Sequence, residues 1–354
     1  MDKLIGWLSC GALRGDDFMA VKMAQFKNIL RFFPPALKEA LEPLPVWDEV
    51  EEIRLRSAKP LLLRLAHRDA FVAQGGFLVD RPEEGFLVTC EEVARTVNIA
   101  SGASLYAFED EIRNGYITLP GGHRLGLAGQ AVTEQGRIRT LKHISGLNFR
   151  IAREVRGAAD GILPCILIGS PPRVCHTLII SPPRAGKTTF LRDLVRQLSD
   201  GLPGFSGVTV GLVDERSELA ACYQGVPQLD VGARTDVMDA CPKAEGIRVM
   251  VRAFGPEVIA TDEIGRAEDA RAVEDALNAG VSVVATAHAG TFEELRRRPF
   301  FRYLFALGVI ERFVLLARRD KPGKVAAILD GSGKTVKLDA GRQMPRHSED
   351  NVSE

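Results

Sequence analysis

The sequence lacks several features that would assign it to a class. Its 354 residues include six cysteines with no C-x-x-C pair, which argues against a zinc site or a disulfide framework. Lys plus Arg equals Asp plus Glu at 46 each, so no net charge favours nucleic acid or acidic lipid. No apolar run approaches the roughly 18 residues that cross a bilayer, and no secretory leader is recognisable. We therefore expect a cytoplasmic protein with reduced thiols.

The composition is that of a globular protein, with 45% hydrophobic and 26% charged residues. Residues 1–25 show no period, and residues 340–354 are polar, so both ends are expected to be disordered. Residues 26–168 mix short strands and helices, which predicts an α+β N-terminal domain. After a turn-rich linker at 169–172, residues 174–339 alternate apolar strands with helices, which is typical of a parallel sheet with crossover helices.

Several local patterns are specific enough to predict single elements. In the N-terminal domain, Thr89 and Glu92 have the spacing of a capping box, so a helix should begin there. Residues 71–78 and 117–132 each predict a hairpin with a glycine-containing turn. The strands expected in the C-terminal sheet are residues 177–181, 208–214, 258–262, 281–286 and 313–317.

The strongest signal is a phosphate-binding loop. Residues 181–188 read Ser-Pro-Pro-Arg-Ala-Gly-Lys-Thr, which is G-x-x-x-x-G-K-T with Ser181 in place of the first glycine. An apolar strand enters the loop and an amphipathic helix leaves it, so backbone N–H groups can surround a polyphosphate. Lys187 would reach the β- and γ-phosphates, and the Thr188 hydroxyl would ligate Mg²⁺. The residues expected to bind the nucleotide are Ser181, Pro182, Pro183, Arg184, Ala185, Gly186, Lys187, Thr188 and Thr189.

A second Gly-Lys-Thr occurs at residues 333–335. It stands between two short apolar runs, and no helical pattern follows that could supply a dipole, so we interpret it as a hairpin turn.

Acidic residues follow the apolar run at 258–261. Asp262 would hold Mg²⁺ through water, and Glu263 would polarise the attacking water. Solvated acids at a strand end are the plain alternative. The phosphate-binding loop upstream favours the catalytic interpretation.

Two further strand ends carry polar residues that should lie at the same edge of the sheet. His288 follows one of them and could sense the γ-phosphate or be structural. The cluster at residues 214–218, which includes Glu215, follows the other; it could orient water or metal, or form a surface ion pair with Arg216. The sequence leaves both alternatives open.

Seven segments of the chain are specific when they occur together: residues 52–56, 119–124, 150–155, 181–188, 214–218, 230–237 and 261–266. Together they resemble the stage III sporulation protein AA family, a relative of the type II secretion and type IV pilus motor ATPases. The resemblance covers residues 33–336, and the family usually has glycine where Ser181 stands, which bears on nucleotide affinity.

The resemblance implies an AAA-type ATPase, with a RecA-like P-loop domain of the α/β class behind a smaller α+β domain. It further implies a homo-oligomeric ring of six subunits, a membrane-embedded platform protein as partner, and a peripheral position at the inner face of the membrane. The resemblance also implies a role in the channel that joins the mother cell and the forespore. In a ring, an arginine from a neighbouring subunit could stabilise transition-state charge, although each candidate could equally form a structural salt bridge. The candidates are Arg54, Arg56, Arg124, Arg150, Arg153 and Arg234.

The leading interpretation is therefore an Mg²⁺-dependent ATPase that converts ATP and water to ADP and phosphate and drives a membrane assembly. The alternative is a nucleic-acid-binding P-loop ATPase, against which the neutral charge and 6% aromatic content argue. A small-molecule kinase would need a lid and an acceptor pocket, and a transporter ATPase a Ser-Gly-Gly-Gln signature; neither is evident.

Overall fold

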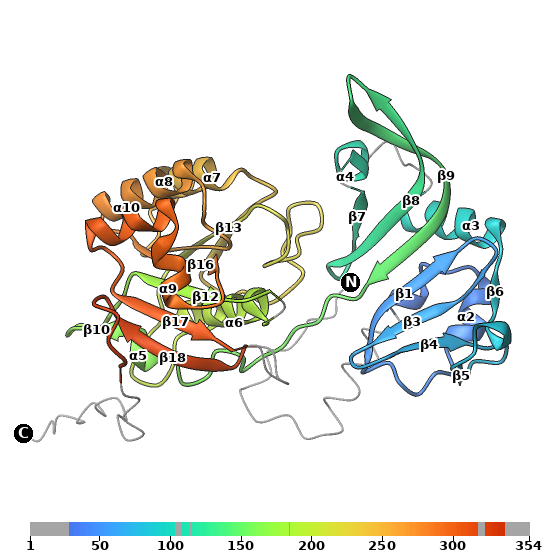
Figure 1. Ribbon diagram of the computed structural model, residues 1–354, viewed down its shortest axis with the longest axis horizontal. Coiled ribbons are helices and arrows are strands. Elements are labelled where there is room, and N and C mark those ends of the chain that lie inside the picture. The colour runs from blue at the N-terminus through green and yellow to red at the C-terminus, as the bar shows by residue number, and fades with distance from the viewer. Residues whose placement is uncertain (1–27, 103–107, 114, 184, 318–322, 337–354) are drawn as a thin grey trace, which may run out of the picture. The chain divides into compact units, whose positions relative to one another are not determined.

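The computed structural model divides the chain into two compact units between Ala152 and Arg153 (Figure 1). It describes residues 28–102, 108–113, 115–183, 185–317 and 323–336. The ends expected to be disordered, and Arg184 of the phosphate-binding loop, lie outside these residues. Among the described helices, none combines the length and the apolar character that a membrane span requires.

The first unit is built on a seven-stranded antiparallel sheet with the order β5-β4-β3-β1-β9-β8-β7. Its strands are β1 (Val50–Arg56), β3 (Leu62–Leu65), β4 (Asp69–Val72), β5 (Leu78–Val79), β7 (Tyr116–Leu119), β8 (His123–Glu134) and β9 (Arg137–Arg150). A two-stranded sheet, β2 (Lys59–Pro60) with β6 (Leu87–Val88), accompanies α2 (Pro35–Leu41), η1 (Pro82–Glu84), α3 (Cys90–Ala100) and α4 (Glu109–Arg113). Phe33 packs against Phe149 in the core, with ring centroids 4.5 Å apart.

The predicted hairpins and the capping box are present in this unit. The Glu92 N–H donates to the Thr89 hydroxyl at 3.1 Å, and the Glu92 carboxylate accepts from the Thr89 N–H at 2.7 Å, so α3 begins where its capping box predicts. Strand β9 was not predicted. It forms a long ribbon with β8 that extends beyond the rest of the sheet in Figure 1.

The second unit contains a seven-stranded sheet with the order β14-β13-β15-β16-β12-β17-β18. All neighbouring strands are parallel except β17 and β18, and the five predicted strands are present. The strands are β12 (Thr177–Ser181), β13 (Val210–Asp214), β14 (Thr235–Asp239), β15 (Val258–Thr261), β16 (Ser282–His288), β17 (Arg312–Leu316) and β18 (Val325–Asp330).

Helices cover both faces of this sheet, as expected for strands that are apolar throughout. One face packs against α5 (Leu163–Ile166) and α6 (Lys187–Asp200). The other packs against α7 (Lys243–Ala253), α8 (Ala267–Asn278), α9 (Phe292–Arg297) and α10 (Pro299–Leu307). The buried side of α6 includes Phe190, Leu191, Leu194, Val195 and Leu198. The result is the predicted α/β P-loop fold.

The boundary between the units lies earlier than the expected linker at 169–172. That segment is the turn between two short antiparallel strands, β10 (Leu167–Ile168) and β11 (Arg173–Val174). Ile162 and Ile166 are buried in the same core cluster as α6. Residues 153–168 therefore pack with the second unit rather than the first.

Candidate functional site

The candidate site lies at the carboxyl edge of the parallel sheet. Ser181, the last residue of β12, stands opposite His288, the last residue of β16. Thr261, at the end of β15, pairs with Val213 on one side and Ala285 on the other. The segments that follow these strands therefore leave the sheet at one edge, where open α/β sheets bind ligands.

The phosphate-binding loop connects β12 to α6. Gly186 directly precedes the helix with φ of +83°, a left-handed conformation that favours glycine. It has no side chain to cap α6, so first-turn N–H groups remain available to an external acceptor. The Ala185 carbonyl accepts from the Gly323 N–H at 2.8 Å, which fixes the loop from the β17–β18 side.

The serine that replaces the first glycine causes no backbone strain. Ser181 is fully buried, and it is not among the described residues with positive φ. Its hydroxyl donates to the Pro182 carbonyl at 2.8 Å, and its carbonyl accepts from the Ala289 N–H at 3.2 Å. The turn thus needs no glycine at this position. Of the other predicted loop residues, Pro182 and Pro183 continue from β12, and Thr188 and Thr189 lie half-buried in the first turn of α6.

Lys187 joins the loop to the acidic strand end. Its Nζ donates to Glu263 Oε1 at 2.7 Å, and the lysine side chain is only 10% exposed. Arg216 Nη1 lies 3.1 Å from Glu263 Oε2, so a cation contacts each carboxylate oxygen. Burial alone would raise the pKa of Glu263, but the Lys187 hydrogen bond and the charges of Lys187 and Arg216 lower it overall. Glu263 is therefore a carboxylate at neutral pH.

Asp262 has a different environment from its neighbour. It is 3% exposed, and burial raises its pKa to about 6 although Lys243 and Lys187 act in the opposite direction. Within the described part of the chain, no hydrogen bond is donated to this carboxylate, which leaves its oxygens for a cation or a cation-bound water.

The donor set suits a magnesium ion that a phosphate ligand helps to hold. The described residues contain no cluster of three or more acidic, histidine or cysteine side chains that could enclose a metal ion. Magnesium is commonly held by one or two carboxylates together with water and substrate phosphates. Asp262 and the Thr188 hydroxyl fit that requirement.

The two acids at the end of β13, Asp214 and Glu215, have different contacts. Asp214 is fully buried and accepts from the N–H groups of Glu218, Leu219 and Ala220 at 2.8–2.9 Å, so it shapes the loop after the strand. Burial raises its pKa, and these hydrogen bonds partly offset the rise. Glu215 pairs with Lys243 Nζ at 3.1 Å. The neighbouring Arg216 contacts Glu263 across the site.

Sequence reasoning missed Lys243, the first residue of α7. Its side chain is 5% exposed, and its Nζ donates to Glu215 Oε2 at 3.1 Å and to the Glu263 carbonyl at 3.2 Å. The residues around Lys243 in the sequence form no recognisable motif. One signal was present: a lysine in the first turn of a helix opposes the helix dipole, so another interaction must hold it there.

His288 lies at the same edge, half-buried at the end of β16. Its charge contributes to the lowered pKa of Glu263, behind the larger contributions of Lys187 and Arg216. The structure thus brings His288 into the electrostatic surroundings of Glu263.

Several of the candidate arginines contact groups of their own unit. Arg54 Nη2 and Arg150 Nε lie 2.6 Å and 3.8 Å from the Glu52 carboxylate. The Arg124 guanidinium stacks over the Tyr116 ring at 4.5 Å. Arg234 donates to the Ser199 carbonyl at 2.7 Å. The other two candidates, Arg56 and Arg153, lie at the end of β1 and directly after the unit boundary.

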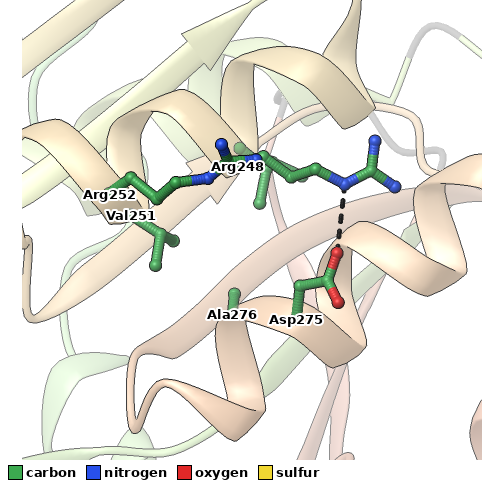
Figure 2. A pocket seen from close by; sticks show the side chains of 6 residues that line it. Arg248, Val251, Arg252, Asp275 and Ala276 are labelled. Carbon is green, nitrogen blue, oxygen red and sulfur yellow. Dashed lines mark hydrogen bonds and ion pairs between the residues drawn. The ribbon is translucent and has the colours of Figure 1, made fainter.

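A surface hollow of about 290 Å³ lies between α7 and α8 of the second unit. Figure 2 shows Arg248 of α7 extending over Asp275 of α8, with Val251 and Ala276 between the two helices. The Arg248 Nε and Asp275 Oδ2 atoms are 3.0 Å apart. The hollow is therefore lined by an ion pair between helices, and it contains none of the predicted site residues.

Comparison with solved structures agrees with this fold. The ATPase DotB of Legionella pneumophila superposes with a TM-score of 0.50 at 15% identity, over 87% of this chain and 78% of that one. The ATPase DotB of Yersinia pseudotuberculosis superposes with a TM-score of 0.51 at 13% identity, over 80% of this chain and 76% of that one. At these identities the likeness concerns the fold.

Comparison of sequences reaches further. The chain is 40% identical over 316 residues to Stage III sporulation protein AA of Bacillus subtilis, which spans 89% of this chain and 98% of that protein. The family model described as "Sporulation stage III, protein AA" matches residues 23–336. The chain therefore belongs to the stage III sporulation protein AA family.

Proposed function

We propose that this chain binds ATP with Mg²⁺ at the carboxyl edge of its parallel sheet and hydrolyses the ATP to ADP and phosphate. The observation that carries the proposal is the 2.7 Å contact between Lys187 Nζ and Glu263 Oε1, which joins two motifs 76 positions apart in the chain. A P-loop lysine and a strand-end acid at one edge are the parts that phosphoryl transfer to water requires.

The loop would supply the phosphate contacts. N–H groups of Ala185, Gly186 and the first turn of α6 would surround the polyphosphate, with the helix dipole adding favourable charge. Lys187 would bind the β- and γ-phosphates. Its burial supports this role because a charge is worth more where water is excluded.

Thr188 and Asp262 would hold the magnesium ion, Asp262 through water. When bound, the ion neutralises charge on the phosphates. Glu263, which stays ionised, would orient and polarise the attacking water. His288 would contact the region of the γ-phosphate, and Glu215, anchored by Lys243, would orient the water or the metal.

On a larger scale, we propose that the subunits form a ring, of six copies, in the cytoplasm at the inner face of the membrane. Hydrolysis would drive a membrane-embedded platform protein of a secretion-like channel during sporulation. Membership of the sporulation family and a fold like that of secretion ATPases support this assignment. An arginine of one subunit would then stabilise charge in the site of its neighbour.

The direct experiment measures phosphate release from ATP by the full-length chain, with and without EDTA, for the wild type and Glu263→Gln. We expect Mg²⁺-dependent release by the wild type and at least a hundredfold loss in the variant. An inactive wild type in the presence of Mg²⁺, or full activity of Glu263→Gln, would contradict the proposal. Activity that requires single-stranded DNA would favour the nucleic-acid alternative.

A further inference from the structure

Lys243 is a buried cation at the candidate site, and the proposed function gives its charge no direct contact with ATP. Lysine is seldom buried unless it is paired, and here the side chain is 5% exposed. Both of its acceptors belong to the site: Glu215 in the loop after β13, and the backbone carbonyl of Glu263 after β15. Lys243 thus links two strand ends to the start of α7.

The backbone at Glu263 explains why such a link is needed. Its φ is +46°, the left-handed region that a residue with a side chain adopts only when its surroundings hold it there. Its N–H donates to the Thr286 hydroxyl at 2.8 Å, and its carbonyl accepts from Lys243 Nζ at 3.2 Å. The two peptide groups that flank Glu263 are therefore fixed by side chains from two other elements.

The second acceptor of Lys243 extends this support to the side chain. Glu215 is adjacent to Arg216, which contacts Glu263 Oε2 at 3.1 Å. The loop that carries both residues is shaped by the Asp214 carboxylate, which accepts three backbone N–H groups. By holding Glu215, Lys243 restrains the position of the adjacent Arg216. Arg216 in turn restrains Glu263 Oε2, the carboxylate oxygen that it contacts.

We infer that Lys243 is a positioning residue, which holds the left-handed turn at Glu263 and the Glu215–Arg216 segment so that the Glu263 carboxylate faces Lys187. The inference depends on the proposed function, because it concerns the geometry of the group that activates water. Displacement of such a group by about 1 Å can cost a hundredfold in rate without loss of substrate binding.

The test uses the full-length chain with Lys243→Met, which keeps the length but removes the charge, and Lys243→Arg, which keeps the charge. Lys334→Met is the matched control, because Lys334 is exposed and lies in the turn after β18, beside the amino ends of β17 and β12 and so at the opposite edge of the sheet from the site. We measure kcat and KM for phosphate release, the Kd of a fluorescent ATP analogue, and thermal unfolding. For Lys243→Met we expect kcat to fall about 10- to 100-fold with KM and Kd within about threefold of the wild type. Lys243→Arg should recover part of kcat, and Lys334→Met should match the wild type.

Other outcomes separate the inference from the proposed function. If the wild type hydrolyses ATP and Lys243→Met keeps its kcat within twofold, the inference is wrong and the proposed function stands. If Lys243→Met raises Kd more than about tenfold, Lys243 binds nucleotide directly and the positioning role is wrong. If the wild type is inactive, both fail. Should Lys243→Met not fold, Lys243→Gln is the second variant: it keeps an N–H donor but is uncharged and one atom shorter, so it loses the ion pair with Glu215. An unchanged kcat in that variant would overturn the claim that this ion pair positions the Glu215–Arg216 segment.

Discussion

Residues 186–188 and residues 333–335 carry the same tripeptide, Gly-Lys-Thr, and the structure gives the two copies opposite surroundings. Gly186 is the N-cap of the 14-residue helix α6, and Lys187 is buried against Glu263. Gly333 lies in a turn after β18, and Lys334 is exposed. The two glycines have nearly the same φ, +83° and +87°, so φ at this residue does not distinguish the copies.

What distinguishes them is the acceptor of their N–H groups. In the second copy, the Asp330 carboxylate accepts from the N–H groups of Ser332 and Lys334 at 2.9 Å and 3.0 Å. The Asp330 carboxylate therefore occupies the N–H groups of that turn, which are not left for an external phosphate. Its interpretation as a hairpin turn is confirmed, since Asp330 N–H donates to the Lys334 carbonyl at 2.8 Å and Leu329 pairs with Thr335. A glycine-lysine-threonine string binds phosphate only where a helix leaves its donors available.

The largest expected difference is between two single variants, Lys187→Ala and Lys334→Ala. Lys187→Ala should lower ATP turnover by at least about a thousandfold, because it removes a buried positive charge beside the phosphates. Lys334→Ala should leave turnover unchanged. Steady-state phosphate release measures both, and circular dichroism checks that the fold persists. Equal activity of the two variants would abolish the distinction between the copies.

The second effect is the change in stability when Asp262 or Asp330 is replaced with asparagine, and at pH 7 it has opposite signs at the two positions. Burial raises the pKa of Asp262 to about 6, so its contribution to stability is present at low pH and is lost as the pH rises through about 6. Asp262→Asn should therefore stabilise the metal-free protein at pH 7 by up to about 3 kcal/mol, and the gain should shrink as the pH falls towards 4. Urea unfolding in EDTA across this pH range measures it.

Asp330 supplies the control. Hydrogen bonds from Ser332 and Lys334 lower its pKa, so its contribution is present at neutral pH and is lost as the pH falls through the folded-state value. Asp330→Asn should slightly destabilise the protein at pH 7 and should match the wild type in acid. If Asp262→Asn destabilised the protein at pH 7, burial would not be the largest influence on the pKa of Asp262.

The smallest expected effect comes from the two glycines. Gly186→Ala and Gly333→Ala should each cost about 1 kcal/mol of stability, because alanine disfavours positive φ. At Gly333 the new methyl group would also lie 2.9 Å from the Phe292 ring. Only Gly186→Ala should weaken nucleotide binding, by about tenfold, because it disturbs the N–H groups that face the phosphates. Thermal unfolding and equilibrium binding separate the two consequences, and weaker binding in Gly333→Ala would contradict this account.

The meeting of Lys187 with Glu263 could be predicted because carboxyl ends of parallel strands share one edge. The strands could also be predicted, because burial on both faces of the sheet leaves uninterrupted apolar runs. The helix after the loop could be predicted from its amphipathic pattern. Strand β14 escaped prediction because it is an edge strand whose residues Thr235–Asp239 are only partly buried and show no alternation.

The supporting charges could not be predicted, because their partners are set by tertiary structure. Glu215 and Arg216 are adjacent in sequence, but they extend to Lys243 and Glu263 respectively. Residues 153–168 carry no clear period, and only their contacts with α6, such as those of Ile162 and Ile166 in its core cluster, assign them to the second unit. Sequence patterns thus identified the elements, whereas the packing of loops decided which charges meet.

The most direct test of the central claim is a calorimetric titration of ATP with Mg²⁺ into the full-length chain. Glu263→Gln serves as the background, so that ATP persists during the titration, and Lys187→Ala and Lys334→Ala are added to it in turn. We predict uptake of one ATP per chain in the background and with Lys334→Ala, and no measurable uptake with Lys187→Ala. Absence of binding in all three proteins, or equal affinity in the two lysine variants, would contradict the claim that the edge at Lys187 binds the nucleotide.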